Sequence, residues 1–160
     1  MKKLLTVLLT ALMVFAATVS IAAEEIGNGP NPSSTVLTYT VGEKYTWTIP
    51  SATDISTTEG ALTNKVTIYG LLADGKKVEI KVSSANGWKV QLGADNDAVD
   101  YTLKADTTTL TNGSVVATLN SGSNTTDTDK LEVELKAQVT GTATKAGAHT
   151  DTLTFTASYS

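Results

Sequence analysis

The chain has no cysteine and no arginine, and its 160 residues include only three prolines, two phenylalanines and one histidine. Without cysteine there is no disulfide, so an exported domain of this sequence must rely on packing and hydrogen bonds. Every basic residue is lysine, so the bidentate capture of phosphate or carboxylate by a guanidinium is not expected. The lack of disulfides suits a Gram-positive surface better than a periplasm or a eukaryotic secretory route.

Positive charge is also scarce. The formal net charge is −4, and a chain this acidic is not steered toward nucleic acid or anionic lipid. The only long apolar run lies at the N-terminus, and no stretch after it is long enough to span a bilayer. We therefore expect no nucleic-acid partner and no membrane span in the mature form.

Residues 1–23 have the order of a secretory signal peptide. Lys2 and Lys3 precede an apolar segment at 4–17, and small residues around Ala22 and Ala23 offer a cleavage site. The alternative is a retained membrane anchor, for which the apolar run is slightly short. We expect cleavage and a secreted, extracellular protein associated with the cell surface.

The rest of the sequence predicts a flexible leader at 24–34, rich in Gly, Asn and Pro, and one β-sandwich domain at 35–160. Threonine and valine, which favour strands, are abundant, and no segment has helical apolar spacing. About nine runs alternate in the manner of half-buried strands. They lie at 36–41, 44–49, 65–72, 77–83, 88–92, 98–104, 114–119, 130–139 and 152–159. This pattern predicts an all-β, immunoglobulin-like antiparallel β-sandwich.

Two turns allow a prediction of strand pairing. A three-residue loop at 85–87 would pair Val82 with Val90, and one at 73–75 would pair Ile68 with Ile80, keeping apolar side chains on one face. Residues 65–92 would then form a three-stranded meander. The alternative is that these turns are arches, which cross between two sheets and impose no such register.

Aromatic residues are few, and two of them could serve a carbohydrate site. Trp47 and Trp88 could stack on a sugar ring, but both fall on the apolar faces of their runs, so burial in the core is the favoured interpretation. The aromatic residues expected outside the core are Tyr69 and Tyr159. The final run places Leu153, Phe155, Ala157 and Tyr159 on one face, and its threonine-lined outer face carries no charge.

No catalytic, cofactor or metal residue is predicted. Asp95, Asn96, Asp97 and Asp100 are spaced as a polar turn rather than as a calcium loop, and Asp127 and Asp129 are a weaker cluster. His149, the single histidine, has no metal-ligand company and no nucleophile motif, so we expect it in a solvated turn. Glu132 and Glu134 share the solvent face of their run.

Two stretches carry a resemblance to a known group. The segment from Tyr45 to Ser51 and the ending from Ala146 to Tyr159 resemble small secreted β-sandwich domains of Gram-positive surface proteins. These domains are of the WxL type and, more distantly, of the fimbrial and spore-coat-U types. The resemblance implies an immunoglobulin-like fold and a structural role outside the cell.

Three functional hypotheses follow. The first is a non-enzymatic structural or adhesive surface protein, with itself or other surface proteins as partners through a sheet edge. The second is a carbohydrate-binding module, which an aromatic strip on the solvent face would favour. The third, an exported hydrolase, would need a pocket with paired carboxylates.

Overall fold

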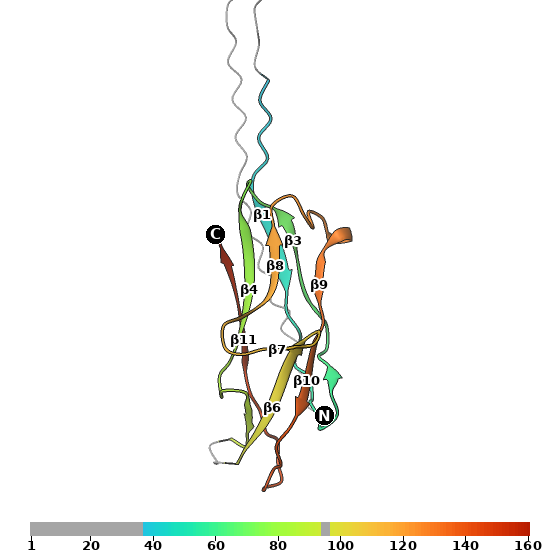
Figure 1. Ribbon diagram of the computed structural model, residues 1–160, viewed down its shortest axis with the longest axis vertical. Coiled ribbons are helices and arrows are strands. Elements are labelled where there is room, and N and C mark those ends of the chain that lie inside the picture. The colour runs from blue at the N-terminus through green and yellow to red at the C-terminus, as the bar shows by residue number, and fades with distance from the viewer. Residues whose placement is uncertain (1–36, 94–96) are drawn as a thin grey trace, which may run out of the picture.

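The structure, a computed structural model, describes residues 37–93 and 97–160. The predicted signal peptide and leader lie outside these residues. The described part is all-β, which confirms the predicted fold class, and its antiparallel strands form three sheets that pack as in a β-sandwich (Figure 1). The elements are β1 (Lys44–Thr48), β2 (Gly60–Ala61), β3 (Val66–Leu71), β4 (Lys77–Ser84), β5 (Lys89–Gln91), β6 (Ala98–Ala105), β7 (Thr108–Thr109), β8 (Ser114–Asn120), a 3-10 turn η1 (Asp127–Asp129), β9 (Leu131–Val133), β10 (Leu135–Val139) and β11 (Leu153–Tyr159).

The strand order gives the layers. One sheet runs β1-β3-β9, a second runs β2-β10-β6-β5 with β7 beside β6, and the third runs β11-β4-β8. Only Glu134 separates β9 from β10, so one stretch of chain passes from the first sheet into the second. In Figure 1 the β10 and β6 strands occupy the lower half of the molecule, and β11 rises beside β4 to the C-terminus.

The core is built by the alternation that the sequence displays. The largest completely buried side chains include Ile68 of β3, Ile80 of β4 and Leu103 of β6, with Leu119 and Leu135 beside them. Full burial of such a side chain contributes about 1.5–3 kcal/mol. The inward faces predicted for these strands are therefore confirmed.

The predicted meander over 65–92 is wrong. The strand β3 pairs with β1 and β9, β4 pairs with β11 and β8, and β5 pairs with β6. The turns at 73–75 and 85–87 are the arches of the alternative interpretation. The strands β3, β4 and β5 belong to three different sheets, and their apolar faces contact one core. The pairing predicted from a common register within one sheet therefore does not apply. Gly75 and Gly87 do have positive φ angles, of 71° and 64°.

Strict alternation over the predicted run at 114–119 would turn Val115 inward together with Ala117 and Leu119, and for Val115 this prediction is wrong. Its side chain is 43% exposed, while Val116 and Ala117 are both buried. The ladder between β4 and β8 shifts register at this point, pairing Ile80 with Ala117 but Lys81 with Val115. A β-bulge of this kind inserts one residue and reverses the alternation beyond it, so β8 is not strictly alternating.

The first predicted run, at 36–41, is not a strand in its described part. Residues 37–43 have no regular secondary structure, and they leave the body of the molecule at the upper end of Figure 1. Leu37, Tyr39 and Val41 are 92%, 88% and 53% exposed. Among residues 37–93 and 97–160, this alternating apolar segment therefore pairs with no sheet that would bury it.

Candidate functional site

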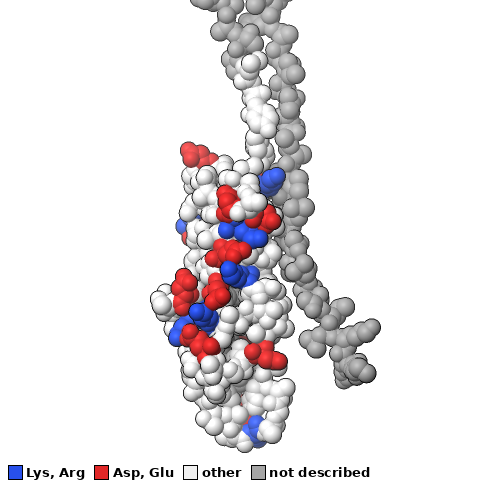
Figure 2. Space-filling view, turned by 90° about the vertical axis from the view of Figure 1, so that its right-hand side faces the viewer, with Lys and Arg blue, Asp and Glu red and all other residues white. Residues whose placement is uncertain are grey.

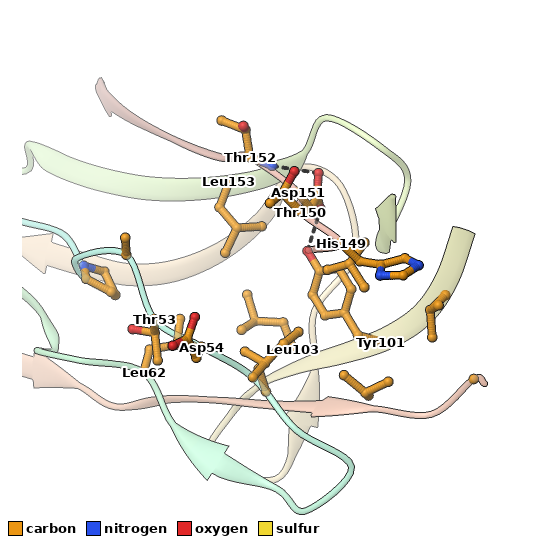
Figure 3. A pocket seen from close by; sticks show the side chains of 18 of the residues that line it. Thr53, Asp54, Leu62, Tyr101, Leu103, His149, Thr150, Asp151, Thr152 and Leu153 are labelled. Carbon is orange, nitrogen blue, oxygen red and sulfur yellow. Dashed lines mark hydrogen bonds between the residues drawn. The ribbon is translucent and has the colours of Figure 1, made fainter. Parts of the chain in front are cut away.

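An open groove of about 1120 Å³ lies in the lower half of the sandwich (Figure 3). Its floor is the inner face of β6 and β10, with Val99, Tyr101 and Leu103 from β6 and Ala137 from β10. One wall is the chain after β1, from Ile49 to Ile55 and Thr57. The other wall is the chain at 149–155, which leads into β11. The volume exceeds the roughly 300–1,000 Å³ of ordinary small-molecule pockets.

The first wall is an irregular segment that local hydrogen bonds hold in place. Pro50 follows β1 and offers no N–H to a ladder. Beyond it, the Ser51 N–H donates to the Thr63 carbonyl at 3.0 Å, and the Thr63 N–H donates to Thr53 Oγ1 at 2.8 Å. These bonds leave the half-buried side chains of Ile49 and Ile55 lining the groove.

The second wall is fixed by Asp97, which is 7% exposed. Its carboxylate accepts from the Thr144 hydroxyl at 2.8 Å and the Lys145 N–H at 2.8 Å, and it lies 2.9 Å from Nε2 of His149. The hydrogen bond from His149 is the main cause that holds the pKa of Asp97 well below its usual range. The same bond raises the pKa of His149.

The imidazole of His149 faces two acceptors. Nδ1 lies 3.1 Å from the Gly147 carbonyl oxygen, which can only accept, and Nε2 faces the Asp97 carboxylate. Only the doubly protonated ring donates to both. The prediction that His149 sits in a solvated turn is wrong, because its side chain is largely buried in an ion pair. The carboxylate in this ion pair, that of Asp97, lies 52 residues away from His149 in the sequence.

A second carboxylate, Asp151, fastens the same wall to β4 and β6. Its Oδ2 accepts from the hydroxyls of Ser84 and Tyr101, each at 2.6 Å, and its Oδ1 accepts from the Asn86 N–H at 3.0 Å. Burial is the main cause that raises the pKa of Tyr101, and the bond to Asp151 adds to it. Figure 3 shows Tyr101 pointing toward Asp151 across the groove floor.

The polar residues singled out from the sequence do not come together as a site. Asp95 and Asn96 lie outside the described residues, and Asp100 pairs with Lys89 at 2.6 Å on the surface. Asp129 caps η1 by accepting from the Thr126 N–H at 2.7 Å. No group of three potential metal ligands occurs among the residues that the structure describes. Asp97 and Asp151 instead anchor the chain, a role that sequence reasoning missed.

The aromatic residues are arranged differently from the prediction. Trp47 and Trp88 pack against the core but are only half-buried, so neither is a fully enclosed core residue. Trp88 precedes β5 with a φ of 66°, and its ring meets Tyr101 edge to face. Within 37–93 and 97–160, the exposed large aromatic side chains are Tyr39 and Tyr159. Tyr69 is half-buried.

Charge is distributed unevenly over the strands. Figure 2 shows lysine and acidic side chains interleaved along one side of the molecule. Ion pairs link Lys65 to Glu132 at 2.8 Å and Lys104 to Glu59 at 2.6 Å, and Glu134 lies 3.5 Å from Lys136. By contrast, no charged residue lies in β11.

The strand β11 has one unpaired side among the described residues, since it pairs with β4 alone. Ser160 and Lys77 exchange both backbone hydrogen bonds, each at 3.0 Å. In an antiparallel ladder such pairs recur at every second residue, so Ser158, Thr156 and Thr154 also face β4. The N–H and C=O groups of Leu153, Phe155, Ala157 and Tyr159 therefore face the unpaired side.

Comparison with known proteins identifies no relative: no protein-family model, curated protein or solved structure matches this chain. In the part of the chain that the structure describes, no helix has the length and apolar character needed to cross a membrane.

Proposed function

We propose that this chain is an exported, non-enzymatic structural protein of the cell surface or extracellular space, and that its copies associate with one another through β-strands. Export is supported by the order of charged, apolar and small residues at 1–23. The immunoglobulin-like character of the fold belongs to this proposal, on the strength of the resemblance.

The observation that carries the proposal is the exposed segment at 37–41. Leu37, Tyr39 and Val41 alternate with Thr38 and Thr40, so in extended form one face of the segment is apolar and the other is hydroxylated. The segment has no charge, proline or glycine. A segment of strong strand propensity with exposed apolar side chains is favoured to pair with another chain.

A comparison of one triple variant with one double variant tests this proposal. Replacing Leu37, Tyr39 and Val41 by serine removes the apolar face and keeps a polar, extended segment. The matched control replaces Thr38 and Thr40 by serine and keeps the apolar face. We expect the wild type and the control to associate with rising concentration and the triple variant to stay monomeric, as measured by size exclusion with light scattering. A monomeric wild type at high concentration would exclude self-association.

A further inference from the structure

We infer that the groove beside β11 is the acceptor site for the 37–41 segment of a second copy of this chain, which enters as an added strand on the unpaired side of β11. This inference rests on the proposed self-association and names the surfaces that meet. It joins two features of the described residues: the segment at 37–41, which belongs to no sheet there, and the edge of β11, which pairs there with β4 alone.

The backbone of β11 supplies the first half of the match. The outward N–H and C=O groups of Leu153, Phe155, Ala157 and Tyr159 offer hydrogen bonds at every second residue. An incoming strand of five residues spans about 17 Å at roughly 3.4 Å per residue, which fits within the seven residues of β11. No charged side chain on β11 opposes this addition.

The groove supplies the second half. The inward side chains of β11 that border it, Leu153 and Phe155, are only half-buried. Ile49 and Ile55 line the same groove. Residues directly opposite on neighbouring strands share a face. An added strand that aligns Leu37, Tyr39 and Val41 with the inward residues of β11 therefore buries its apolar side chains against this lining.

The other edge of the same sheet is a poorer acceptor. The outer strand there is β8, and its contacts include β3 and β9 of the facing sheet, so that side of the sandwich is closed. Its alternation is also interrupted by the bulge at Val116. No residue of β8 lines the groove described above, so a strand added at β8 would not lie beside that groove.

The donor and acceptor lie at different places on one molecule. The 37–41 segment leaves at the upper end in Figure 1, while the groove lies in the lower half between β10, β6 and the start of β11. The two surfaces are different patches, so the contact is heterologous. Each subunit then donates to one neighbour and accepts from another, so the assembly grows in one direction, as an open chain where the rotation between neighbours does not close into a ring.

A proline placed on β11 tests the edge. Ala157→Pro removes an N–H that faces the unpaired side, and proline is tolerated in an edge strand at such a position. We expect loss of association with cooperative melting retained. The control Ser158→Pro removes an N–H that faces Glu79 of β4 and should lower the melting temperature instead. Ala157→Pro that melts cooperatively and still associates as the wild type does would overturn the inference.

Disulfide trapping gives a second readout, which a folding defect does not mimic. The chain has no cysteine, so Thr40→Cys combined with Thr154→Cys or Thr156→Cys forms only engineered bonds, on the outer face of the added strand. We expect a ladder of covalent oligomers on a non-reducing gel in at least one combination. The control pairs Thr40→Cys with Thr118→Cys on β8 and should give no ladder.

The outcomes separate the two proposals. If the wild type associates but neither β11 combination gives a ladder, or the β8 combination gives one, the groove is not the acceptor while self-association stands. If the wild type is monomeric at all concentrations, self-association fails and the acceptor site fails with it.

Discussion

At the scale of single residues, the least expected finding is that the only histidine is structural. His149 and Asp97 form a largely buried ion pair that holds the chain before β11 against the loop before β6. The carboxylate also accepts two backbone N–H groups, from Thr144 and Lys145. Such a pair stabilises the fold only while the imidazole is protonated and the carboxylate is not.

The direction of the pH dependence follows from the two pKa shifts. The pKa of His149 is raised above its ordinary 6.5 in the fold, so its contribution is complete below that pH and is lost as the pH rises through the raised pKa. The pKa of Asp97 is lowered from 3.8, so its contribution is present above that pH and is lost in stronger acid. The pair therefore stabilises the fold most between these two values.

We predict that the melting temperature falls more steeply in the wild type than in His149→Gln as the pH rises above 6.5 and through the raised pKa of His149. The variant should melt at a lower temperature near pH 5, because glutamine cannot supply the positive charge. Calorimetry across the pH range measures both effects, and NMR titration of the single imidazole reports its pKa directly. An imidazole that titrates below 6.5 would contradict the ion pair.

At the scale of strands, local alternation determined what was predictable. In β3, β4 and β11, apolar residues recur at every second position, so their faces can be assigned from sequence. The pairing partners of these strands could not be assigned from the sequence, because a three-residue turn fits a hairpin and an arch equally well. The role of Asp97 was equally hidden, since its partners lie beyond residue 143 and meet it only in the fold. The groove has the same origin, because its walls come from segments far apart in sequence.

The pairing of β1 with β3 depends on a glycine. Gly70 lies opposite Tyr45, and a Cβ atom at Gly70 would collide with the backbone of Lys44 and Tyr45. Gly60 of β2 has open space at the same position. Both glycines lie in strands, so substitution by alanine at the two positions differs mainly in whether the added Cβ atom collides with a neighbouring strand.

We predict that Gly70→Ala lowers the free energy of unfolding by about 1–3 kcal/mol, the usual cost of overpacking. Gly60→Ala should change it by less than about 0.5 kcal/mol, as surface substitutions do. Urea unfolding followed by tryptophan fluorescence measures both, since Trp47 reports on β1. Equal effects of the two substitutions would show that the approach of β1 to Gly70 is not tight.

At the scale of the whole molecule, one chain carries both the donor segment and the proposed acceptor groove. A variant that lacks only one of them should therefore still join an assembly at one end and stop its growth there. This property distinguishes a directional chain from non-specific aggregation. In non-specific aggregation, a single altered patch would weaken the association but would not stop the growth of an assembly at one end.

We predict that the variant with serine at 37, 39 and 41 shortens wild-type assemblies when it is added in small proportion, because its groove accepts a strand and it donates none. Ala157→Pro should act in the same way from the opposite end. Mixed in equal amounts, the two variants should form a one-to-one dimer and nothing larger. Light scattering on the mixtures measures this, and larger species in the equal mixture would exclude the directional arrangement.

Glu43 connects the base of the 37–41 segment to the end of β11. Its carboxylate accepts from the Ala73 N–H at 2.6 Å and from the Tyr159 hydroxyl, and so it joins the base of the 37–41 segment to the last residues of β11. In the proposed chain of subunits, tension applied at the donor segment would reach β1 through the backbone and β11 through the hydrogen bond between Glu43 and Tyr159. Stretching would pull the added strand along its own axis, parallel to β11, so that all its hydrogen bonds would share the force at once.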